Sequence, residues 1–489
     1  MPVPAQASAQ QTEIAVVGAG AAGLYAALCA ARDGARVVLI SATPLAQTAS
    51  YWAQGGLAAT LGDDDSFELH LADTERAGRD LVRRSAAEIL VREAPDRVRD
   101  LQVLGVRFDA DRFGQLALGL EGGHSVRRVV HAGGSATGRR VVRQLSALAV
   151  SAERITVLEN TRAQAVWRAG DRCRGLICDN GQALAARAVI IATGGAAALW
   201  SRTTNPPGSQ GVGLLLAHAA GAALADLEML QFHPTAVIGV AGREGFLITE
   251  AIRGEGATLH DARGERFVDE LAARDVVSRA VHRVLQESGE RSVALDMRDI
   301  DPARFPNVVG ALRDAGLDPT TQRIPVAPAA HYMMGGIVTD LNARSTIPGL
   351  YAVGEASCTG LHGATRLASN SLSECFVFAA RAVADALSTS AAPFGELPPP
   401  QRAEPPPAAD QATREAVWRD AGVVRDGSGL QRLLENPHPL ARLIARGALA
   451  RVESRGAHLR SDYPDTDPSF DHRHALFTGS DELDWQIWN

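Results

Sequence analysis

The sequence predicts an α/β fold in which one nucleotide-binding domain is interrupted by an inserted domain and followed by a small helical domain. Three short apolar segments have the pattern of buried strands and run directly into glycine turns, at residues 14–20, 188–195 and 349–355. A proline-rich stretch at residues 393–407 is typical of an extended linker, and helical spacing follows it. With roughly 100–200 residues per domain, a chain of 489 residues has room for these units.

The first of these strands opens a βαβ unit over residues 13–40. Its turn consists of Gly18, Ala19, Gly20, Ala21, Ala22 and Gly23, and an alanine-rich helix follows. Such glycines permit a tight turn, and a helix N-terminus directs N–H groups at a pyrophosphate, so the unit predicts dinucleotide binding. The second strand ends in Ser41 and Ala42, without the acidic residue typical of NAD sites. This disfavours NAD and leaves FAD open.

The remaining elements follow from pattern and spacing. A glycine-rich loop at 43–60 contains Gln54, Gly55 and Gly56, and residues 62–104 have helical spacing with one charged face. Residues 155–167 and 174–191 alternate like strands, and the inserted domain is expected from about 228 to 340. Helical spacing returns over 371–387 and again over 410–456.

Composition excludes several classes of chemistry. All 49 basic residues are arginine, which excludes a lysine Schiff base and the lysine of a phosphate-binding P-loop. The net charge of −7 and the lack of a basic block disfavour a nucleic-acid partner. No apolar run predicts a membrane span, and the N-terminus lacks a signal-peptide pattern. Five cysteines without C-x-x-C spacing disfavour a disulfide scaffold or a zinc ribbon and fit a reducing cytoplasm, so a cytoplasmic location is expected.

Further motifs carry a family resemblance. They resemble, in the same order, the substrate loops of the succinate dehydrogenase/fumarate reductase flavoprotein family, and they occupy residues 231–235, 249–257, 273–280, 328–336 and 360–372, with a matching tail at 453–458 and 462–464. The resemblance implies a Rossmann-like FAD-binding domain interrupted by an α+β capping domain and followed by a C-terminal helical domain. The expected boundaries are 1–227 and 341–392 for the FAD-binding domain, 228–340 for the cap, 393–409 for the linker and 410–489 for the helical domain.

Within the family, Glu121-Gly122-Gly123-His124-Ser125 resembles the branch that oxidises L-aspartate. A carboxylate at position 121 can pair with a substrate ammonium group, which succinate lacks. Ala49 stands where membrane-bound relatives attach FAD through a histidine, so non-covalent FAD is expected.

The implied reaction moves a hydride from Cα of L-aspartate to flavin N5 and gives iminoaspartate, the first step of de novo NAD synthesis through quinolinate. Oxygen or fumarate would accept the electrons, and quinolinate synthase would be the pathway partner. The alternatives are a soluble fumarate reductase or succinate dehydrogenase flavoprotein, or a flavin-binding subunit without catalysis. A monomer or homodimer is expected, with no metal.

The resemblance also implies roles for individual residues. Arg366 would hold a substrate carboxylate, His233 and His331 would donate to carboxylate oxygens, and Thr249 and Glu250 would complete the polar wall. Arg274 would transfer a proton or stabilise charge, while Glu121 would meet the ammonium group. His124 and His362 remain open between a site role and a structural one.

The expected cofactor contacts form a longer set. They are the turn from Gly18 to Gly23, Ser41, Ala42, Thr48, Gln54, Gly55, Gly56, Gly194, Glu355, Asn370, Ser371 and Leu372. The last three open a helix whose N-terminus would place positive potential near the flavin N1–C2=O edge. One position departs from the family, because Val212 replaces a usual aspartate between Gly211 and Gly213.

Overall fold

A computed structural model describes residues 10–389, 404–479 and 481–489. Its largest sheet has the strand order β6-β2-β1-β9-β8-β7, with β16 also paired to β9. The strands are β1 Gln10–Val17, β2 Val37–Ile40, β6 Ile155–Leu158, β7 Ala163–Ala169, β8 Arg172–Cys178, β9 Ala183–Ile191 and β16 Leu350–Ala352. The parallel strands are β1, β2, β6, β9 and β16. The three predicted glycine junctions therefore meet at the edge of the sheet formed by the carboxyl ends of these strands.

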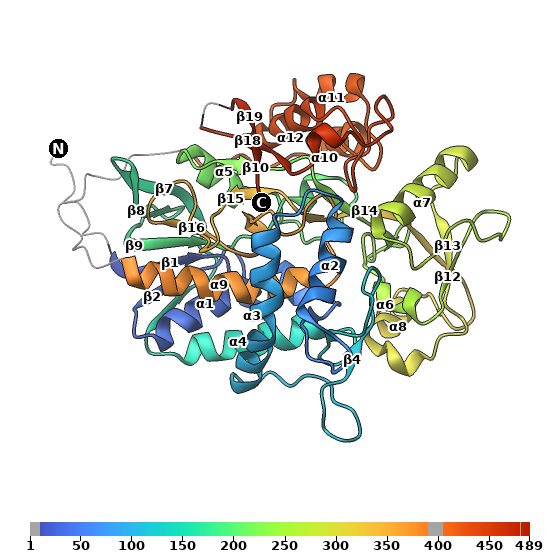
Figure 1. The fold of residues 1–489 in the computed structure, drawn as a ribbon, viewed down its shortest axis with the longest axis horizontal. Helices are drawn as coiled ribbons and strands as arrows, with labels where there is room; N and C mark the ends of the chain where they lie inside the picture. Colours follow the sequence, from blue (N-terminus) through green and yellow to red (C-terminus); the bar gives the residue numbers. More distant parts are fainter. Residues whose placement is uncertain (1–9, 390–403, 480) are drawn as a thin grey trace.

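Helices cover one face of this sheet (Figure 1). The helices on this face are α1 Ala21–Arg32, α4 Thr137–Ser151 and α9 Asn370–Thr389. Outside them, α3 Arg84–Val103 packs against α9, and α2 Phe67–Gly78 packs against α3. α1 packs against α9, and Tyr25 meets Phe376 edge to face with ring centroids 5.2 Å apart. A small antiparallel sheet lies beside α9, made of β3 Leu57–Ala58, β5 Val129–Val130 and β4 Leu118–Gly119 in that order. The short turns η1 Leu45–Gln47 and η2 Ala49–Trp52 precede it.

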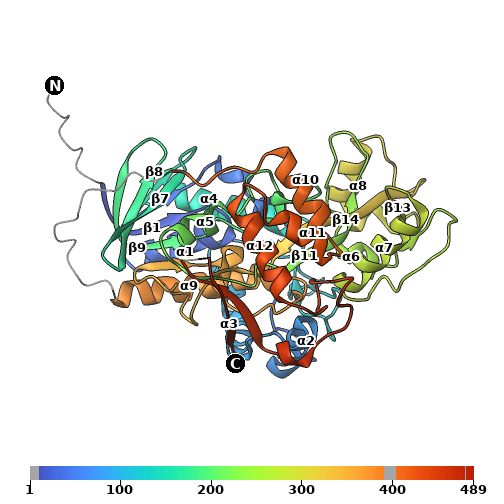
Figure 2. The ribbon, with the colours of Figure 1, turned by 90° about the horizontal axis from the view of Figure 1, so that it is seen from above.

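A second body, which we call the cap body, has its own sheet and core. Its antiparallel strands have the order β11-β14-β13-β12, and helices pack against them. The elements are β11 Leu230–Val237, β12 Thr258–His260, β13 Val293–Asp296, β14 Ile324–Met333, α6 Glu250–Gly254, α7 Arg274–Ser288, η4 Pro302–Arg304 and α8 Pro306–Arg313. Buried Val277, Val281 and Leu295 belong to its core. Both views place this body at one end of the molecule (Figures 1 and 2).

The C-terminal helices lie over the junction of the two larger bodies (Figure 2). They are α10 Gln411–Asp420, α11 Gly427–Leu433 and α12 Pro439–Ala450. Trp200, beside η3 Ala197–Leu199 and α5 Val212–Ala219, donates its indole N–H to the carbonyl of Ala421 at 2.8 Å. The predicted linker falls largely on residues 393–403, which are outside the described residues; residues 404–409 carry no helix or strand.

The end of the chain differs from the expected helical domain. After η6 Pro468–Phe470, the hairpin of β18 Arg473–Phe477 and β19 Leu483–Ile487 joins a sheet of order β17-β15-β10-β18-β19. The other strands are β10 Leu224–Ala225, β15 Gly336–Val338 and β17 Ser357–Cys358, which η5 Gly354–Ala356 precedes. The C-terminal segment is thus helical only to Ala450. The predicted fold class is otherwise confirmed, and none of the described helices is long and apolar enough to cross a membrane.

Candidate active site

The glycine turn between β1 and α1 is shaped by close backbone packing. Gly18 has a φ of +107°, and a side chain there would overlap the carbonyl of Ala192 at the end of β9. A side chain on Gly23 would overlap the carbonyl of Gly18. The hydroxyl of Ser50 accepts the N–H of Ala21 at 3.1 Å. The sequence therefore folds here into a turn that only glycine allows, with the N-terminus of α1 at the edge where the three junctions meet.

Several buried polar atoms around this edge lack partners. The hydroxyls of Thr48 and Thr193 and the side-chain oxygen of Gln54 have no hydrogen-bond partner in the described parts of the chain. Gly194 has a φ of +77° and open space where a side chain would be. Unsatisfied buried polar atoms are costly, so this pattern indicates a polar ligand.

Glu355 and the start of α9 border the same region. The carboxylate of Glu355 accepts the N–H of Met333 at 2.9 Å, and burial raises its pKa to about 7. Asn370 begins α9, but its side chain is engaged by His70 at 2.8 Å and donates to Thr74 at 3.0 Å. The backbone N–H of Asn370 also donates to the carbonyl of Leu367 at 3.4 Å, so a ligand at this helix start would meet the N–H groups of the residues that follow.

The guanidinium groups of Arg274 and Arg366 converge on the side-chain amide of Gln231. The side-chain oxygen of Gln231 accepts from Arg274 Nη1 at 3.0 Å and from Arg366 Nε and Nη2 at 3.4 and 3.3 Å. Gln231 Nε2 in turn donates to the carbonyl of Arg366 at 3.0 Å. Burial and the nearby Arg274 lower the pKa of Arg366 to about 10. Both cations are thus held close together in a buried place, which suits an anionic ligand.

Glu250 partly balances this positive charge. Its Oε2 accepts from Arg274 Nε at 2.6 Å, and Arg253 lies 3.7 Å from its Oε1. Burial raises the pKa of Glu250, but the guanidiniums of Arg274 and Arg253 outweigh it and bring the pKa to about 2. Glu250 is therefore ionised and orients arginine, which agrees with one of the two roles expected for it. Thr249 caps α6 by accepting the N–H of Ala251 at 3.4 Å.

Two histidines face each other across this cluster, with ring centroids 5.1 Å apart. His233 Nδ1 accepts the N–H of Thr235 at 3.3 Å, so its Nε2 carries the proton of the neutral ring. His331 Nε2 accepts from Arg366 at 3.4 Å, and its Nδ1 bonds Thr204 at 2.8 Å. Burial, together with Arg274, lowers the pKa of both rings well below the ordinary value. His233 can donate to a ligand, whereas His331 in this arrangement orients Arg366.

Glu121 supplies a second carboxylate, and it is only half satisfied. Ser369 donates its hydroxyl to Glu121 Oε2 at 2.6 Å and accepts the N–H of Gly56 at 3.1 Å. Glu121 Oε1 is buried and has no hydrogen-bond partner among the described residues. A Cβ on Gly55 would lie 3.6 Å from this oxygen, so the predicted cofactor loop and Glu121 are neighbours.

Other candidate residues have partners inside the protein. His124 bonds the carbonyl of Ala368 at 2.9 Å and Arg128 at 3.0 Å, and His362 pairs with Glu374 at 2.8 Å. Both therefore have structural partners, which favours the structural side of the two roles left open for them. The Ser41 hydroxyl donates to the carbonyl of Thr43 at 2.6 Å. Val212 is the first residue of α5 and packs against the core beneath the sheet.

Sequence reasoning gave no role to Gln231, Ser369 or His131. Gln231 and Ser369 lie inside motifs that resemble the family, so their places near the site could be predicted. Their contacts could not, because Gln231 bonds Arg366 across 135 residues and Ser369 bonds Glu121 across 248. His131 lies 3.9 Å from Glu121 Oε1 and had no sequence signal.

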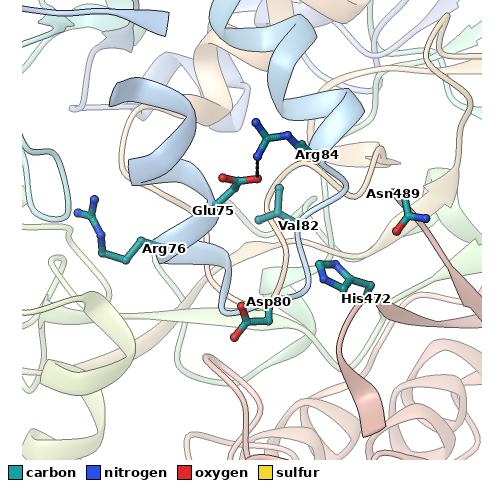
Figure 3. A pocket seen from close by; sticks show the side chains of 7 residues that line it. All are labelled: Glu75, Arg76, Asp80, Val82, Arg84, His472 and Asn489. Carbon is teal, nitrogen blue, oxygen red and sulfur yellow. Dashed lines mark hydrogen bonds and ion pairs between the residues drawn. The ribbon is translucent and has the colours of Figure 1, made fainter. Parts of the chain in front are cut away.

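A surface hollow lies elsewhere, between α2 and the C-terminal hairpin (Figure 3). It has a volume of about 450 Å³. Glu75, Arg84 and His472 line it, and Glu75 and Arg84 are already paired at 2.6 Å. The charges of this pair neutralise each other, so the hollow lacks the concentrated positive charge of the buried arginine cluster.

Comparisons with known proteins agree on one family. Residues 13–372 match the FAD binding domain, and residues 434–487 match the fumarate reductase flavoprotein C-terminal domain. The L-aspartate oxidase of Caulobacter vibrioides is 46% identical over 485 residues, covering 93% of this chain and 94% of the relative. That of Streptomyces coelicolor is 40% identical and covers 97% and 92%.

Solved structures show the same architecture. A point variant of the Escherichia coli quinol fumarate reductase FrdA has a TM-score of 0.87 at 28% identity, covering 98% of this chain and 97% of that one. A quinol-fumarate reductase with menaquinol molecules has a TM-score of 0.88 at 28% identity, covering 99% and 98%.

Proposed function

The chain belongs to the L-aspartate oxidases, a branch of the FAD-binding flavoproteins, and from this premise we propose that its buried site oxidises L-aspartate to iminoaspartate. One observation supports this substrate over a plain dicarboxylate. Glu121 offers a buried oxygen without a partner in the described chain, and its charge acts on the guanidinium of Arg366. L-aspartate matches this set, because it carries two carboxylates and one ammonium group.

The residues at the sheet edge fit non-covalent FAD. The β1–α1 turn and the start of α9 offer helix N-termini, and the unpartnered atoms of Thr48, Gln54 and Thr193 offer polar contacts to hydroxyl, phosphate and carbonyl groups. Ala49 offers no nucleophilic atom for covalent attachment at the family position. When bound, FAD supplies the acceptor for the substrate hydride.

The substrate carboxylates would meet Arg366, Arg274 and the Nε2–H of His233. Because Gln231 holds the two guanidiniums in fixed places, the two arginine side chains need not rearrange to meet the substrate. Glu250 remains ionised beside Arg274 and keeps that guanidinium oriented. His331 fixes Arg366 from the other side through its Nε2. These contacts position Cα for hydride loss, and burial of the cluster excludes water.

The physiological setting is part of the proposal. Oxygen or fumarate would reoxidise the cofactor, and iminoaspartate would pass to quinolinate synthase in NAD synthesis. A cytoplasmic enzyme that acts as a monomer or homodimer fits this role. The expected cap over residues 228–340 would close on the substrate.

The test is anaerobic mixing of the flavin-loaded protein with L-aspartate or succinate while the absorbance of oxidised flavin is recorded. Bleaching by L-aspartate supports the proposal. Bleaching by succinate alone would select a fumarate reductase or succinate dehydrogenase, and a protein that takes up no flavin would indicate a non-catalytic subunit. Glu121→Gln should lower L-aspartate turnover far more than fumarate reduction, whereas equal losses would remove Glu121 as the ammonium partner.

A further inference from the structure

His131 lies beside the one unpartnered oxygen of Glu121. Its Nε2 is 3.9 Å from Glu121 Oε1, and its side chain is 17% exposed whereas that of Glu121 is 3% exposed. His131 directly follows β5, and it leans over Gly119 on the neighbouring strand β4, where a Cβ would lie 2.7 Å from Nε2. The imidazole therefore connects a buried carboxylate with the solvent.

The gap between His131 Nε2 and Glu121 Oε1 leaves room for a hydrogen-bond donor of a ligand. A separation of 3.9 Å exceeds a hydrogen bond, so the two groups do not satisfy each other. A nitrogen with several protons can donate to both, as an ammonium group does. In the described chain, no carboxylate except Glu121 lies within 4.0 Å of the ring nitrogens of His131.

The other charged groups around His131 are occupied. The carboxylate of Asp109 accepts the N–H groups of Gly133 and Gly134, each at 2.7 Å. Arg128 is paired with Asp65 and Asp73. The guanidinium of Arg140 lies against Gly133, two residues after His131.

We propose that Glu121 and His131 together bind the ammonium group of the amino-dicarboxylate, and that His131 is the base that takes its proton. This inference rests on the proposed function. An N–H bond of the ammonium breaks and its proton moves to His131 Nε2. The Cα–H bond breaks and its hydrogen leaves with the electron pair to the oxidised flavin, which is reduced. The nitrogen lone pair forms the C=N bond, and the imidazolium releases its proton to solvent.

The alternatives within the site are weaker bases. His233 and His331 are buried beside guanidiniums that lower the pKa of both rings and keep them neutral, and His331 Nε2 already accepts from Arg366. A carboxylate has an ordinary pKa near ~4 and an imidazole one near ~6.5, so an imidazole is the better match to a neutral working pH. Arg274 is cationic and paired with Glu250.

Two variants test this from different directions. His131→Asn removes the base, and Gly119→Ala keeps it but displaces the imidazole by placing a methyl group 2.7 Å from Nε2. His131→Asn should lower kcat/KM for L-aspartate by about 100-fold or more, and Gly119→Ala should lower it in the same direction. In the wild-type enzyme kcat/KM should fall as the pH is lowered, because a protonated base cannot accept the ammonium proton, and this fall should be absent in His131→Asn. Fumarate reduction should stay within about twofold, because fumarate has no ammonium proton to lose. The exposed His472→Asn is the matched control.

Binding gives a readout without turnover. We would titrate L-aspartate and succinate into the anaerobically reduced, flavin-loaded enzyme, which cannot accept a hydride. His131→Asn should weaken L-aspartate binding by about 10- to 100-fold, as expected for one lost charge-assisted hydrogen bond, and leave succinate binding unchanged.

Three results would overturn the inference: an unchanged pH profile, equal losses for L-aspartate and fumarate, or equal losses for both ligands in the binding experiment. Failure of the wild-type enzyme to oxidise L-aspartate is a different result. It would refute the proposed function, and the binding titration would still decide whether His131 recognises an ammonium group.

Discussion

At the scale of single residues, the site depends on groups that have no charge of their own. Gln231 separates two guanidiniums that would otherwise repel each other, and its single oxygen accepts from both. Ser369 plays the matching part for Glu121, since its hydroxyl occupies one carboxylate oxygen and leaves the other for a ligand. Ser369 has a φ of +62°, a backbone conformation that costs a non-glycine residue energy. The fold therefore maintains a strained turn at the position that orients Glu121.

Gln231→Leu should impair both reaction directions alike. The substitution keeps the volume but removes the acceptor that holds Arg274 and Arg366 together, so both carboxylate contacts lose their alignment. We expect kcat/KM for L-aspartate oxidation and for fumarate reduction to fall by about 10- to 100-fold. Steady-state kinetics in both directions measure this, with the exposed Gln431→Leu on α11 as control. A loss confined to one direction would contradict the shared role.

Glu250 gives the cluster a defined pH dependence. Its pKa falls from the ordinary value to about 2 in the folded protein, so its contribution is present above about pH 4–5 and is lost as the pH falls through the folded pKa. The corresponding stabilisation is on the order of 3 kcal/mol. The unfolding free energies of wild type and Glu250→Gln should therefore differ at about pH 5 and differ by about half as much at about pH 3. Denaturant unfolding at the two pH values measures this difference. The side chain of Glu287 is 69% exposed, so the difference between wild type and Glu287→Gln should not change between these pH values.

The sequence indicates some of these residues and cannot indicate others. Glu121, Arg274 and Arg366 stand in recognisable motifs, and the structure brings them to one place; their roles remain predictions. The partners of Glu121 could not be inferred, because Ser369 is 248 residues away and His131 belongs to a stretch without a motif. The direction of individual hydrogen bonds could not be predicted from the sequence either. The Thr235 N–H that fixes the proton of His233 on Nε2 follows from a β-bulge in β11.

At the scale of elements, the β1–α1 turn and the start of α9 border the proposed cofactor site, and both were predictable from local sequence patterns. A glycine turn between a strand and a helix is a local signal, and α9 starts at Asn370, one residue before the expected helical run. The final hairpin was not predictable. β18 pairs with β10, a very short strand that lies far earlier in the chain, so no local pattern announces the contact.

The β1–α1 turn allows a sharp comparison between two of its glycines. A methyl group on Gly23 would overlap the carbonyl of Gly18, whereas one on Gly20 meets only the Ser50 hydroxyl at 3.1 Å, and Gly20 has an ordinary φ of −75°. Gly23→Ala should lower stability by about 2–4 kcal/mol and abolish flavin retention, because the turn must open. Gly20→Ala should keep the fold.

Thermal unfolding of the flavin-free proteins and the ratio of flavin to protein after gel filtration measure the two effects separately. Equal behaviour of the two variants would show that the Gly18–Gly23 approach does not control the turn.

At the scale of the whole molecule, the cap body touches the rest of the chain on several sides of the site. Gln54 donates to the carbonyl of Leu247 at 2.7 Å, and Arg139 donates to Asn307 at 2.7 Å. Arg79, at the end of α2, lies 3.3 Å from Asp275, the residue after Arg274. The structure therefore shows the cap body seated over the site.

The Arg79–Asp275 pair also connects the cap body with the C-terminal segment. Arg455 is almost fully buried, pairs with Glu453, and donates to the carbonyl of Arg79 at 2.7 Å. The backbone of Arg79 is thus fixed from behind while its side chain reaches the start of α7, where Arg274 enters the site. Through this pair the C-terminal segment can influence the placement of Arg274, although none of its described residues contributes a side chain to the arginine cluster itself.

Asp275→Asn should therefore favour an open cap body without changing the arginine cluster. Arg79 is 40% exposed, so the ion pair contributes only about 0.2–1 kcal/mol to closure. Converted by the thermal energy, this predicts a rise in KM of roughly 1.4- to fivefold, about equal for L-aspartate and fumarate, with kcat changed less. Quenching of flavin fluorescence by iodide should increase in the free enzyme and return to the wild-type value at saturating succinate. Arg79→Gln should reproduce the effect, and the double variant should add nothing to it, because both changes remove the same contact. If the two single losses added, Arg79 and Asp275 would act through separate partners, and cap closure would have to depend on Gln54 and Arg139 instead.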